Sequence, residues 1–410
     1  MKFVSRENLP FFRFASVAWL NACVLSFVVV YPISATEPEL ETKPQSTTAA
    51  VPDFSAAAKI LQAGVEDKAY PGCAVVVGTS RGVLWRKAFG KISPDGAATT
   101  TQTLYDLASL TKVVGTTTVF VTLVRDEKLA LDDPVAKYLP TFVTAIDDEQ
   151  EQTRRKKITL ESLLTHSAGL SPWQPFHKSA SNYDEVLVAI QKTPLATAPG
   201  TREQYSDLGF MLLGEIAARA GGKKLPELER ERVFTPLGLK NLLRNPPAEL
   251  LPQIAPTERR PERTDFWHGV VHDENARTGE GVTGHAGLFA SADDLAVWAA
   301  EWLKGSRGES RILPRELVEK FTRRRELVEG SSRALGWDTP TKGGSAGTQL
   351  SPKAFGHTGF TGTSVWLDPT RDVYVLLLSN AVCPQRGNTR VFRIRRELCD
   401  AVIAAMNAEK

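Results

Sequence analysis

The sequence predicts an α/β protein of the α+β type, with one antiparallel sheet built from both ends of the chain. Residues 72–90 form two apolar, β-branched-rich runs joined by a Ser-Arg-Gly turn, which is typical of a β-hairpin. Residues 355–380 contain two or three further strands, separated by the turn-forming segment 368–372. Because the middle of the chain is mostly helical, a simple βαβ series is excluded. We expect the sheet to be flanked by helices, with an inserted, mostly helical region.

The expected helices follow in chain order. They are residues 111–126, 159–165, 207–220, 292–303 and 391–406, and the last has apolar residues at clear helical spacing. Prolines and glycines interrupt the rest of the middle region. No internal repeat is present, so a solenoid or propeller is excluded.

The first residues of the chain have the pattern of a secretory signal. Basic residues precede an apolar run over 15–33, and small residues suitable for cleavage follow. We therefore expect 1–35 to be a signal peptide or, if uncleaved, an N-terminal membrane anchor. Residues 36–52 are rich in Thr, Pro, Glu and Ala, which predicts a flexible linker before a folded domain at 53–410. This pattern favours a periplasmic or secreted protein, with a membrane tether if the segment is retained.

The composition excludes several classes of partner. The 410 residues are 42% hydrophobic and 24% charged with a net charge of +3, which is typical of a globular protein without a nucleic-acid surface. After residue 35 the cysteines are Cys73, Cys383 and Cys399, an odd number that cannot be fully paired. No Cys-x-x-Cys or His/Cys cluster is present, so we expect neither a metal nor another cofactor.

The stretch DLASLTKVVG contains the first candidate catalytic pair, Ser109 and Lys112. Residues three positions apart share one face of a helix, which brings the lysine amine within reach of the serine hydroxyl. A serine hydroxyl is a weak nucleophile and needs a base beside it, and a lysine can serve when its surroundings lower its pKa. Free backbone N–H groups at the helix start can stabilise the oxyanion formed on attack.

Two later stretches contain further candidate residues of the same site. Tyr205, in YSDLGF, immediately precedes a predicted helix, and a nearby lysine cation would favour its phenolate form for acid–base catalysis. The run GHTGFTG, residues 356–362, places glycines inside a predicted strand. Interior glycines weaken a strand, but they suit a place where substrate lies against the backbone. An edge strand there could pair with an extended acyl substrate.

The order S-x-x-K, Y-x-D and H-T-G resembles the serine β-lactamase and penicillin-binding protein superfamily. The resemblance runs from about residue 52 to the end of the chain. It is strongest to the branch of class C β-lactamases, D-alanyl-D-alanine carboxypeptidases and related esterases. Supporting phrases are LALDDPVAKYLP, ITLESLLTHSAGL and GVTGHAGLFASADDLAVWAAEWL. The phrase GVVHDENA, which contains His272 and Asp273, resembles carboxypeptidase-like and esterase-like members, and we expect it at the rim of the pocket rather than at a metal site.

The resemblance implies a role for each matching residue. Ser109 would be the acylated nucleophile, Lys112 would take or relay its proton, and Tyr205 would protonate the leaving group and activate water. The backbone N–H groups of Ser109 and Phe360 would form the oxyanion hole. The residues that would line the substrate are Asp207, His357, Thr358 and Gly359.

Two positions depart from the family pattern. Asp207 stands where asparagine is more usual, and an ionised aspartate cannot donate to a substrate carbonyl, so we expect it to pair with Lys112. His357 stands where the β-lactamases have lysine, and a mostly neutral histidine deprives a substrate carboxylate of its fixed partner. Both changes weaken the case for an efficient β-lactamase and leave an esterase, amidase or carboxypeptidase open, and we expect β-lactam turnover to be slow.

The resulting expectation is an exported serine hydrolase that forms an acyl-enzyme on Ser109. Its substrate would be a small-molecule ester or a D-amino-acid peptide of the cell wall. The alternative is a penicillin-binding or sensor domain of the same fold that binds without turnover, or becomes acylated without being released. Because all three catalytic positions are retained, the sequence favours the enzyme.

Overall fold

The computed structural model describes residues 51–261 and 263–408, which belong to one compact unit, Ala50–Lys410. The predicted signal or anchor segment, and residues 36–50 of the predicted linker, lie outside the described residues. No helix in the described part of the chain combines the length and the apolar character needed to cross a membrane.

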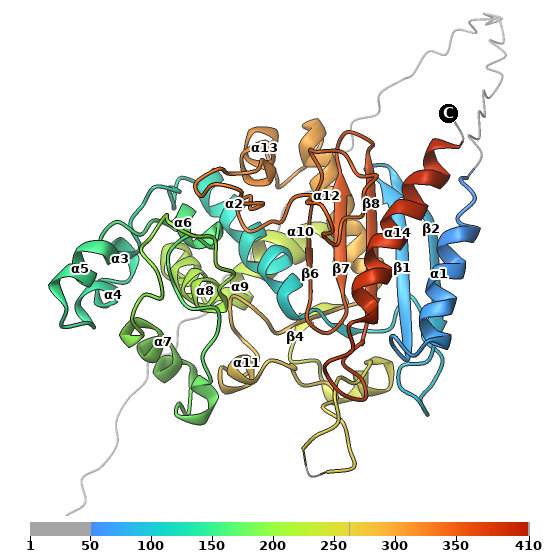
Figure 1. Cartoon of the computed structure of the whole chain (residues 1–410), viewed down its shortest axis with the longest axis horizontal. Helices are drawn as coiled ribbons and strands as arrows, with labels where there is room; N and C mark the ends of the chain where they lie inside the picture. Colours follow the sequence, from blue (N-terminus) through green and yellow to red (C-terminus); the bar gives the residue numbers. More distant parts are fainter. Residues whose placement is uncertain (1–50, 262, 409–410) are drawn as a thin grey trace, which may run out of the picture. The chain divides into compact units, whose positions relative to one another are not determined.

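A five-stranded antiparallel sheet joins the two ends of this unit, in the order β2-β1-β8-β7-β6 (Figure 1). Its strands are β1 (Gly72–Thr79), β2 (Gly82–Gly90), β6 (Phe355–Thr358), β7 (Ser364–Asp368) and β8 (Val373–Ser379). The pairing of β1 with β8 brings the early hairpin beside the late strands. The predicted fold class, with a sheet built from both chain ends, is confirmed.

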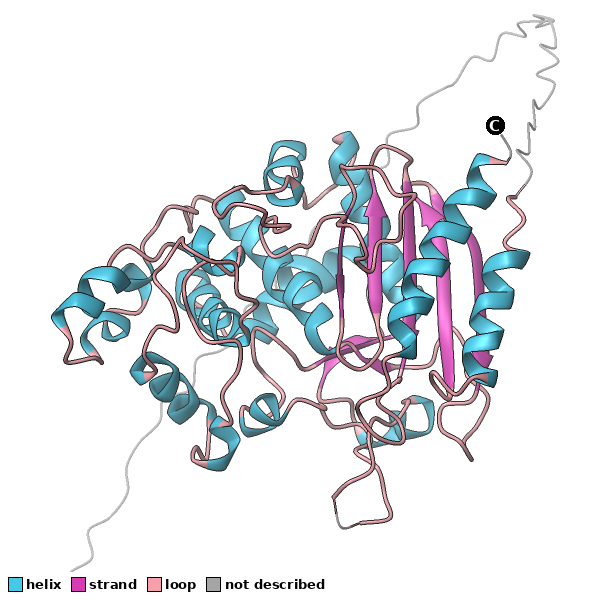
Figure 2. Cartoon of the chain, in the orientation of Figure 1, coloured by secondary structure: helices cyan, strands magenta, loops and turns pink. Residues whose placement is uncertain are grey.

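Helices cover both faces of this sheet (Figure 2). The helices α1 (Ser55–Glu66) and α14 (Arg390–Asn407) pack together on one face, and α12 (Ala292–Arg307) covers the other. Successive side chains of β1 point to opposite faces, so Val75 and Val77 join the α1/α14 core while Val76 joins the core beneath α12. Burial on both faces explains why β1 is apolar along almost its whole length.

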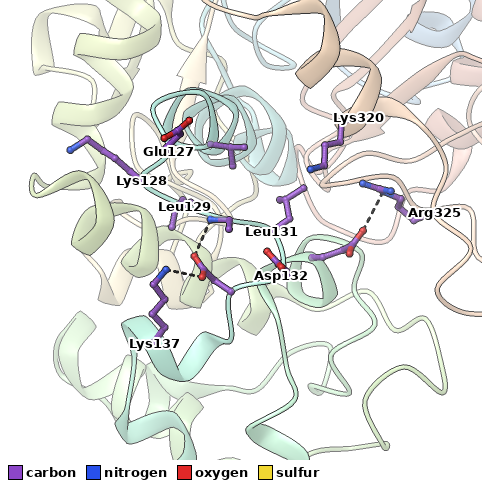
Figure 3. Close-up of a pocket in the computed structure, with 12 residues that line it drawn as sticks. Glu127, Lys128, Leu129, Leu131, Asp132, Lys137, Lys320 and Arg325 are labelled. Atoms are coloured by element: carbon purple, nitrogen blue, oxygen red, sulfur yellow. Dashed lines mark hydrogen bonds and ion pairs between the residues drawn. The ribbon is translucent and has the colours of Figure 1, made fainter.

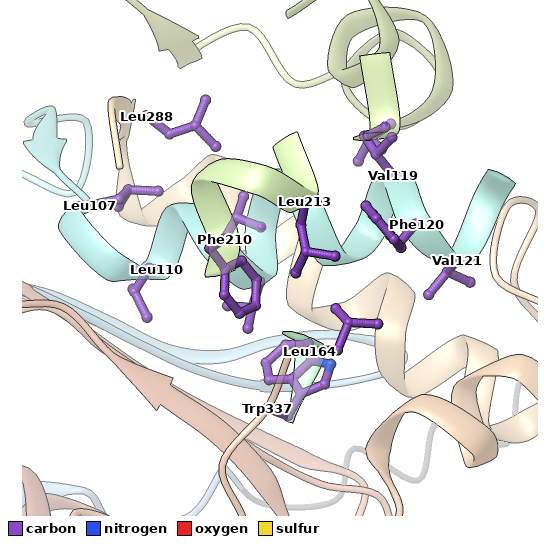
Figure 4. Packing of buried hydrophobic residues seen from close by; sticks show 14 of the residues in the cluster. Leu107, Leu110, Val119, Phe120, Val121, Leu164, Phe210, Leu213, Leu288 and Trp337 are labelled. Carbon is purple, nitrogen blue, oxygen red and sulfur yellow. The ribbon is translucent and has the colours of Figure 1, made fainter. Parts of the chain in front are cut away.

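The middle of the chain is helical, as the sequence predicts. Its helices are α2 (Thr118–Arg125), α3 (Val135–Tyr138), α4 (Thr141–Thr144), α5 (Glu149–Arg155), α6 (Leu160–Leu164), α7 (Tyr183–Lys192), α8 (Asp207–Gly221), α9 (Leu225–Glu229), α10 (Thr235–Leu237), α11 (Glu274–Thr278) and, after α12, α13 (Arg315–Thr322). The core between them and the sheet contains Phe120, Leu213, Phe210 and Trp337 (Figure 4).

The segment expected as one helix over 111–126 is divided. A 3₁₀ turn at Ala108–Leu110 leads into a π-helical stretch at Lys112–Thr117, and regular α-helix begins only at Thr118. Two β-branched valines, two threonines and a glycine occupy the π-helical stretch, a composition that weakens the α-helical preference. Short π-helical stretches are frequent at functional sites, and this one begins at the predicted catalytic lysine.

A second, three-stranded sheet was not expected from the sequence. It has the order β3-β5-β4, formed by β3 (Tyr105–Asp106), β5 (Leu288–Ala290) and β4 (Leu242–Arg244). Strands of two or three residues are too short to show alternation. This sheet fixes the backbone immediately before Ser109, because β3 ends at Asp106 and pairs with β5.

Candidate active site

Ser109 lies in a backbone turn of unusual conformation. The preceding residue, Ala108, has φ of +45°, a region that residues other than glycine rarely adopt. The side chain of Asp106 stabilises this conformation, because its Oδ1 accepts the Ala108 N–H at 2.8 Å. Burial raises the pKa of the Asp106 carboxyl, although backbone N–H donors oppose the shift. Such strain is frequent at active sites and here it orients the serine.

The side chain of Lys112 is fully buried and has three polar neighbours. Its Nζ lies 3.0 Å from Ser109 Oγ, 3.2 Å from the carbonyl oxygen of His285 and 2.7 Å from Asp207 Oδ1. Burial alone lowers the pKa of Lys112, but Asp207 and Tyr205 together outweigh it and the net pKa is raised. In the resting protein Lys112 is therefore an ammonium group that donates to the serine.

Tyr205 precedes α8, and its ring lies 5.0 Å from Lys112 Nζ. Burial raises the pKa of Tyr205, and the charge of Lys112 opposes this shift. The Tyr205 hydroxyl is buried without a hydrogen-bond partner among the described residues. The ring of His166 lies 4.5 Å from that of Tyr205, and its Nδ1 accepts the Ser206 N–H at 3.0 Å, so this histidine supports the turn that holds the tyrosine.

The H-T-G run begins on the edge strand β6, as expected. Gly356 lies inside this strand and pairs with Trp366, but the strand ends at Thr358, so Gly359 and Gly362 lie in the turn formed by residues 359–363. His357 Nδ1 lies 2.8 Å from the carbonyl oxygen of Thr358, and it must donate the proton because a carbonyl can only accept. Burial holds the pKa of His357 well below its usual value. Its Nε2 is therefore an unprotonated acceptor at neutral pH.

The turn at residues 359–363 is attached to the backbone that leads to Ser109. Thr361 Oγ1 donates to the carbonyl oxygen of Asp106 at 2.7 Å, and Thr363 Oγ1 donates to that of Leu107 at 3.1 Å. The Phe360 N–H makes no hydrogen bond within the described residues, so it is free to bind an oxyanion. These two threonines fix the position of Phe360 relative to the serine.

A cavity of about 510 Å³ connects the predicted residues, since Ser109, Tyr205, His357 and Phe360 all contribute to its wall. Another cavity of about 520 Å³ lies elsewhere (Figure 3). None of the predicted site residues lines that second cavity. Its wall includes ion pairs between Lys137 and Asp133 and between Arg325 and Glu161. We therefore place the candidate site in the first cavity.

Sequence reasoning missed Arg333, for which no motif exists. Arg333 lines the same cavity, lies 5.3 Å from the centre of the Tyr205 ring and pairs with Glu203 at 2.8 Å. Burial lowers the pKa of Arg333, but the charges of Asp338 and Glu203 outweigh it and raise the net pKa. The cavity therefore contains a permanent cation beside the tyrosine.

The phrase containing His272 and Asp273 contributes to the surroundings of the site. The His272 ring stacks at 5.6 Å on that of Phe360. Asp273 Oδ1 lies 2.9 Å from His285 Nε2, and these two side chains and Asp207 offer ligand atoms within 4.8 Å of one another. Carboxylates and imidazole are suitable metal ligands, but the ammonium of Lys112 already neutralises Asp207.

A serine, a lysine and a tyrosine gathered at the end of an antiparallel sheet, beside a free N–H on its edge-strand turn, are the features of a serine hydrolase. The chain belongs to the Beta-lactamase family, whose model matches residues 57–398. A relative from Escherichia coli (strain K12), described as "Putative D-alanyl-D-alanine carboxypeptidase", is 34% identical over 77% of this chain and 79% of its own length.

Solved structures show the same fold. A penicillin-binding protein homologue from Caulobacter crescentus matches with a TM-score of 0.69 and 22% identity, over 87% of this chain and 99% of its own. EstCE1, a hydrolase with promiscuous acyltransferase activity, matches with a TM-score of 0.69 and 22% identity, over 85% of this chain and 99% of its own. The predicted family and the predicted class, a serine hydrolase, are confirmed.

Proposed function

We propose that this protein is an exported serine hydrolase that forms an acyl-enzyme on Ser109. The observation that carries the proposal is the 3.0 Å contact between Lys112 Nζ and Ser109 Oγ at the cavity that also holds Tyr205. Export rests on the sequence pattern of residues 1–35, which also supports a periplasmic or secreted location or a membrane tether.

Acylation begins when Lys112 has lost its extra proton. The neutral amine accepts the proton of Ser109 while Oγ attacks the substrate carbonyl. The N–H groups of Ser109 and Phe360 bind the oxyanion that forms. Tyr205 gives its proton to the leaving group as the bond to the carbonyl carbon breaks, and Lys112 then returns a proton to Tyr205.

Deacylation uses the same groups in reverse. Water attacks the acyl-enzyme while its proton passes to the Tyr205–Lys112 pair, and the Ser109 oxygen leaves and recovers a proton from that pair. The sheet-edge residues His357, Thr358 and Gly359 line the substrate during both steps.

The substrate is an ester or a D-amino-acid peptide. Arg333 favours the peptide as the substrate, because a guanidinium in the cavity can bind the carboxylate of a terminal D-amino acid. The name of the Escherichia coli relative supports the same substrate class. The neutral, acceptor-only Nε2 of His357 disfavours a β-lactam carboxylate at the sheet edge. We therefore propose weak β-lactamase activity at most.

The alternative is a protein of this fold that binds a ligand, or becomes acylated, without turnover. The observation that favours it is the ion pair of Lys112 with Asp207, because an ammonium cannot accept a proton from serine or water. Deacylation would then be slow at neutral pH.

The test uses residues 36–410 and the variant Ser109→Ala. Intact mass is recorded after treatment with a fluorophosphonate, followed by assays with neutral esters and D-Ala-D-Ala peptides. One adduct on the wild type, absent from the variant, together with turnover of either substrate supports the enzyme. An adduct without turnover supports the acyl-trapping alternative, and no adduct on folded protein contradicts an activated serine.

A further inference from the structure

Arg395 lines the candidate cavity and contacts the turn that carries the candidate oxyanion-hole N–H. It projects from α14, which Figure 1 shows alongside the late strands. One of its nitrogens, Nη2, donates to the carbonyl oxygens of Gly359 at 2.8 Å and Thr363 at 2.9 Å. These carbonyls lie at the two ends of the turn that presents Phe360.

The charge of Arg395 has no acidic partner. The residue is only 4% exposed, and within the described part of the chain no carboxylate forms an ion pair with it. Its Nε is buried and makes no hydrogen bond with any residue that the structure describes. Burial lowers the pKa of Arg395 to about 10, so the side chain is still a cation at neutral pH. Because an unpaired buried charge is costly, the carbonyl contacts of the turn are its main compensation.

The bond to Gly359 acts directly on the Phe360 N–H. The carbonyl of Gly359 and the N–H of Phe360 belong to one peptide group, which is trans. In a trans peptide the two groups point in opposite directions, so a donor that holds the oxygen also fixes the direction of the N–H. A positive charge on the carbonyl oxygen also polarises the peptide and makes the N–H a stronger donor.

The other contacts of the turn differ from that of Arg395 in what they bond to or in carrying no charge. Thr361 and Thr363 attach the turn to the Asp106–Leu107 backbone, where their hydroxyls donate to the carbonyl oxygens of Asp106 and Leu107 and not to the Gly359 carbonyl. The Gly359 oxygen also accepts the Gly362 N–H at 3.1 Å, which is an uncharged contact within the turn itself. Arg395 is therefore the charged group that bonds to this peptide from outside the turn.

We propose that Arg395 is a positioning residue that orients and polarises the Phe360 N–H of the oxyanion hole. The proposal rests on the proposed function, in which that N–H binds the oxyanion. It predicts that Arg395 contributes to the transition state and not to substrate binding, since the developing negative charge exists only there.

The experiment compares a neutral aryl ester with the matched thionoester, in which sulfur replaces the carbonyl oxygen. Sulfur accepts weaker hydrogen bonds than oxygen, so the ratio of kcat/KM for the two substrates reports on the oxyanion hole. A neutral substrate also excludes any effect of lost carboxylate binding. The variants are Arg395→Met and the charge-retaining Arg395→Lys. Arg396→Met is the matched control, because Arg396 lies on the same helix and donates at 3.3 Å to Gly343.

For Arg395→Met we expect kcat on the ester to fall about 100-fold with KM within about 3-fold, and the ester-to-thionoester ratio to fall with it. Arg395→Lys should recover part of the ratio, and Arg396→Met should match the wild type. Equal losses on both substrates, or a change in KM alone, would overturn the proposal.

If Arg395→Met has no cooperative thermal transition, the ratio is measured on the neutral variant Arg395→Gln, where an unchanged ratio overturns the proposal. The proposed function is tested separately, by the activity and labelling of the wild type. If the wild type hydrolyses neither ester and Ser109 forms no fluorophosphonate adduct, the proposed function fails. If the wild type is active and the variants keep its ratio, only the role of Arg395 fails.

Discussion

Lys112 Nζ and Asp207 Oδ1 lie 2.7 Å apart, in an ion pair where the lysine side chain is fully buried. The same ammonium contacts the hydroxyl of Ser109. Burial favours the neutral amine, but the carboxylate of Asp207 and the nearby Tyr205 together favour the ammonium more strongly, and the pKa of Lys112 is raised. Serine activation should therefore require a higher pH than it would with an uncharged residue at position 207.

Replacing Asp207 by asparagine removes the charge that stabilises the ammonium. We expect the pH of half-maximal Ser109 acylation to fall by about one unit or more in Asp207→Asn. The rate of fluorophosphonate labelling, followed from pH 6 to pH 10, measures the shift. Asp133→Asn is the matched control. Asp133 forms an ion pair with Lys137, also at 2.7 Å, but this pair does not line the candidate site. An unchanged midpoint in Asp207→Asn would show that the pair does not control activation.

β-Lactam turnover should be slow, because His357, in the wall of the cavity, is neutral and its Nε2 can only accept a hydrogen bond. Nitrocefin hydrolysis by the wild type should be far slower than hydrolysis of the preferred ester or peptide. A lysine at this position restores a cation, so His357→Lys should lower KM for nitrocefin by about 10-fold. Rapid nitrocefin hydrolysis by the wild type would contradict this interpretation of His357.

Arg333 should distinguish charged from neutral substrates. In Arg333→Met we expect kcat/KM for a D-Ala-D-Ala peptide to fall about 10- to 100-fold, which corresponds to the loss of a charge-assisted hydrogen bond. A neutral ester should lose less than about 3-fold. Because Arg333 pairs with Glu203, the variant Glu203→Gln tests whether loss of that pair alone causes the effect. Equal losses on peptide and ester would mean that Arg333 supports the site without binding the carboxylate.

Gly359 should tolerate no side chain. A Cβ at this position would overlap Thr363 Oγ1 and the carbonyl oxygen of Leu107, so the turn would have to move away from Ser109. We expect Gly359→Ala to destabilise the fold by about 1–3 kcal/mol and to lower kcat by about 100-fold. Urea unfolding and ester hydrolysis measure the two effects. Gly209→Ala provides a comparison, because Gly209 lies in the helix α8 and a Cβ there would make only ordinary van der Waals contacts. Wild-type activity in Gly359→Ala would show that the turn adapts.

Acid should weaken the fold partly through two buried histidines. Burial holds the pKa of His166 and of His357 well below the usual 6.5. The unfolded chain binds these protons near pH 6.5 while the folded chain does not. The stabilisation that comes from these two neutral histidines is therefore complete above pH 6.5. It is lost as the pH falls toward the pKa that the histidines have in the folded protein. Each group contributes up to about 1.4 kcal/mol per pH unit, and urea unfolding at pH 7.5, 6 and 5 measures the slope.

The variant His357→Gln keeps a polar side chain that does not titrate. It should have a smaller pH slope than the wild type, whatever its stability at pH 7.5. Identical slopes would show that protonation of His357 does not contribute.

The sequence predicted the sheet and the main helices because their apolar patterns are long. The hairpin at 72–90 and the helix at 391–406 each contain enough residues to show their periodicity, and both are present. The small sheet containing β3 could not be predicted, because its strands depend on partners distant in the sequence. The π-helical stretch after Ser109 was likewise missed, since local spacing does not distinguish it from an α-helix.

The candidate catalytic residues could be named because the motif fixes their spacing. The contacts around these residues could not be predicted, because they involve residues that are far apart in the chain. Asp106 supports the backbone before Ser109, and Arg333 and Arg395 reach the cavity from two other segments. No short motif marks these three positions, and only the folded chain shows that they meet.

The pairing of β1 with β8 also has a consequence for the synthesis of the protein. Ser109 is made long before the turn that presents Phe360 and the helix that carries Arg395. Contacts between such distant segments form late, after most of the chain is available. A nascent chain therefore carries its nucleophile long before it has the groups that make the nucleophile reactive, and fragments released early would be catalytically silent.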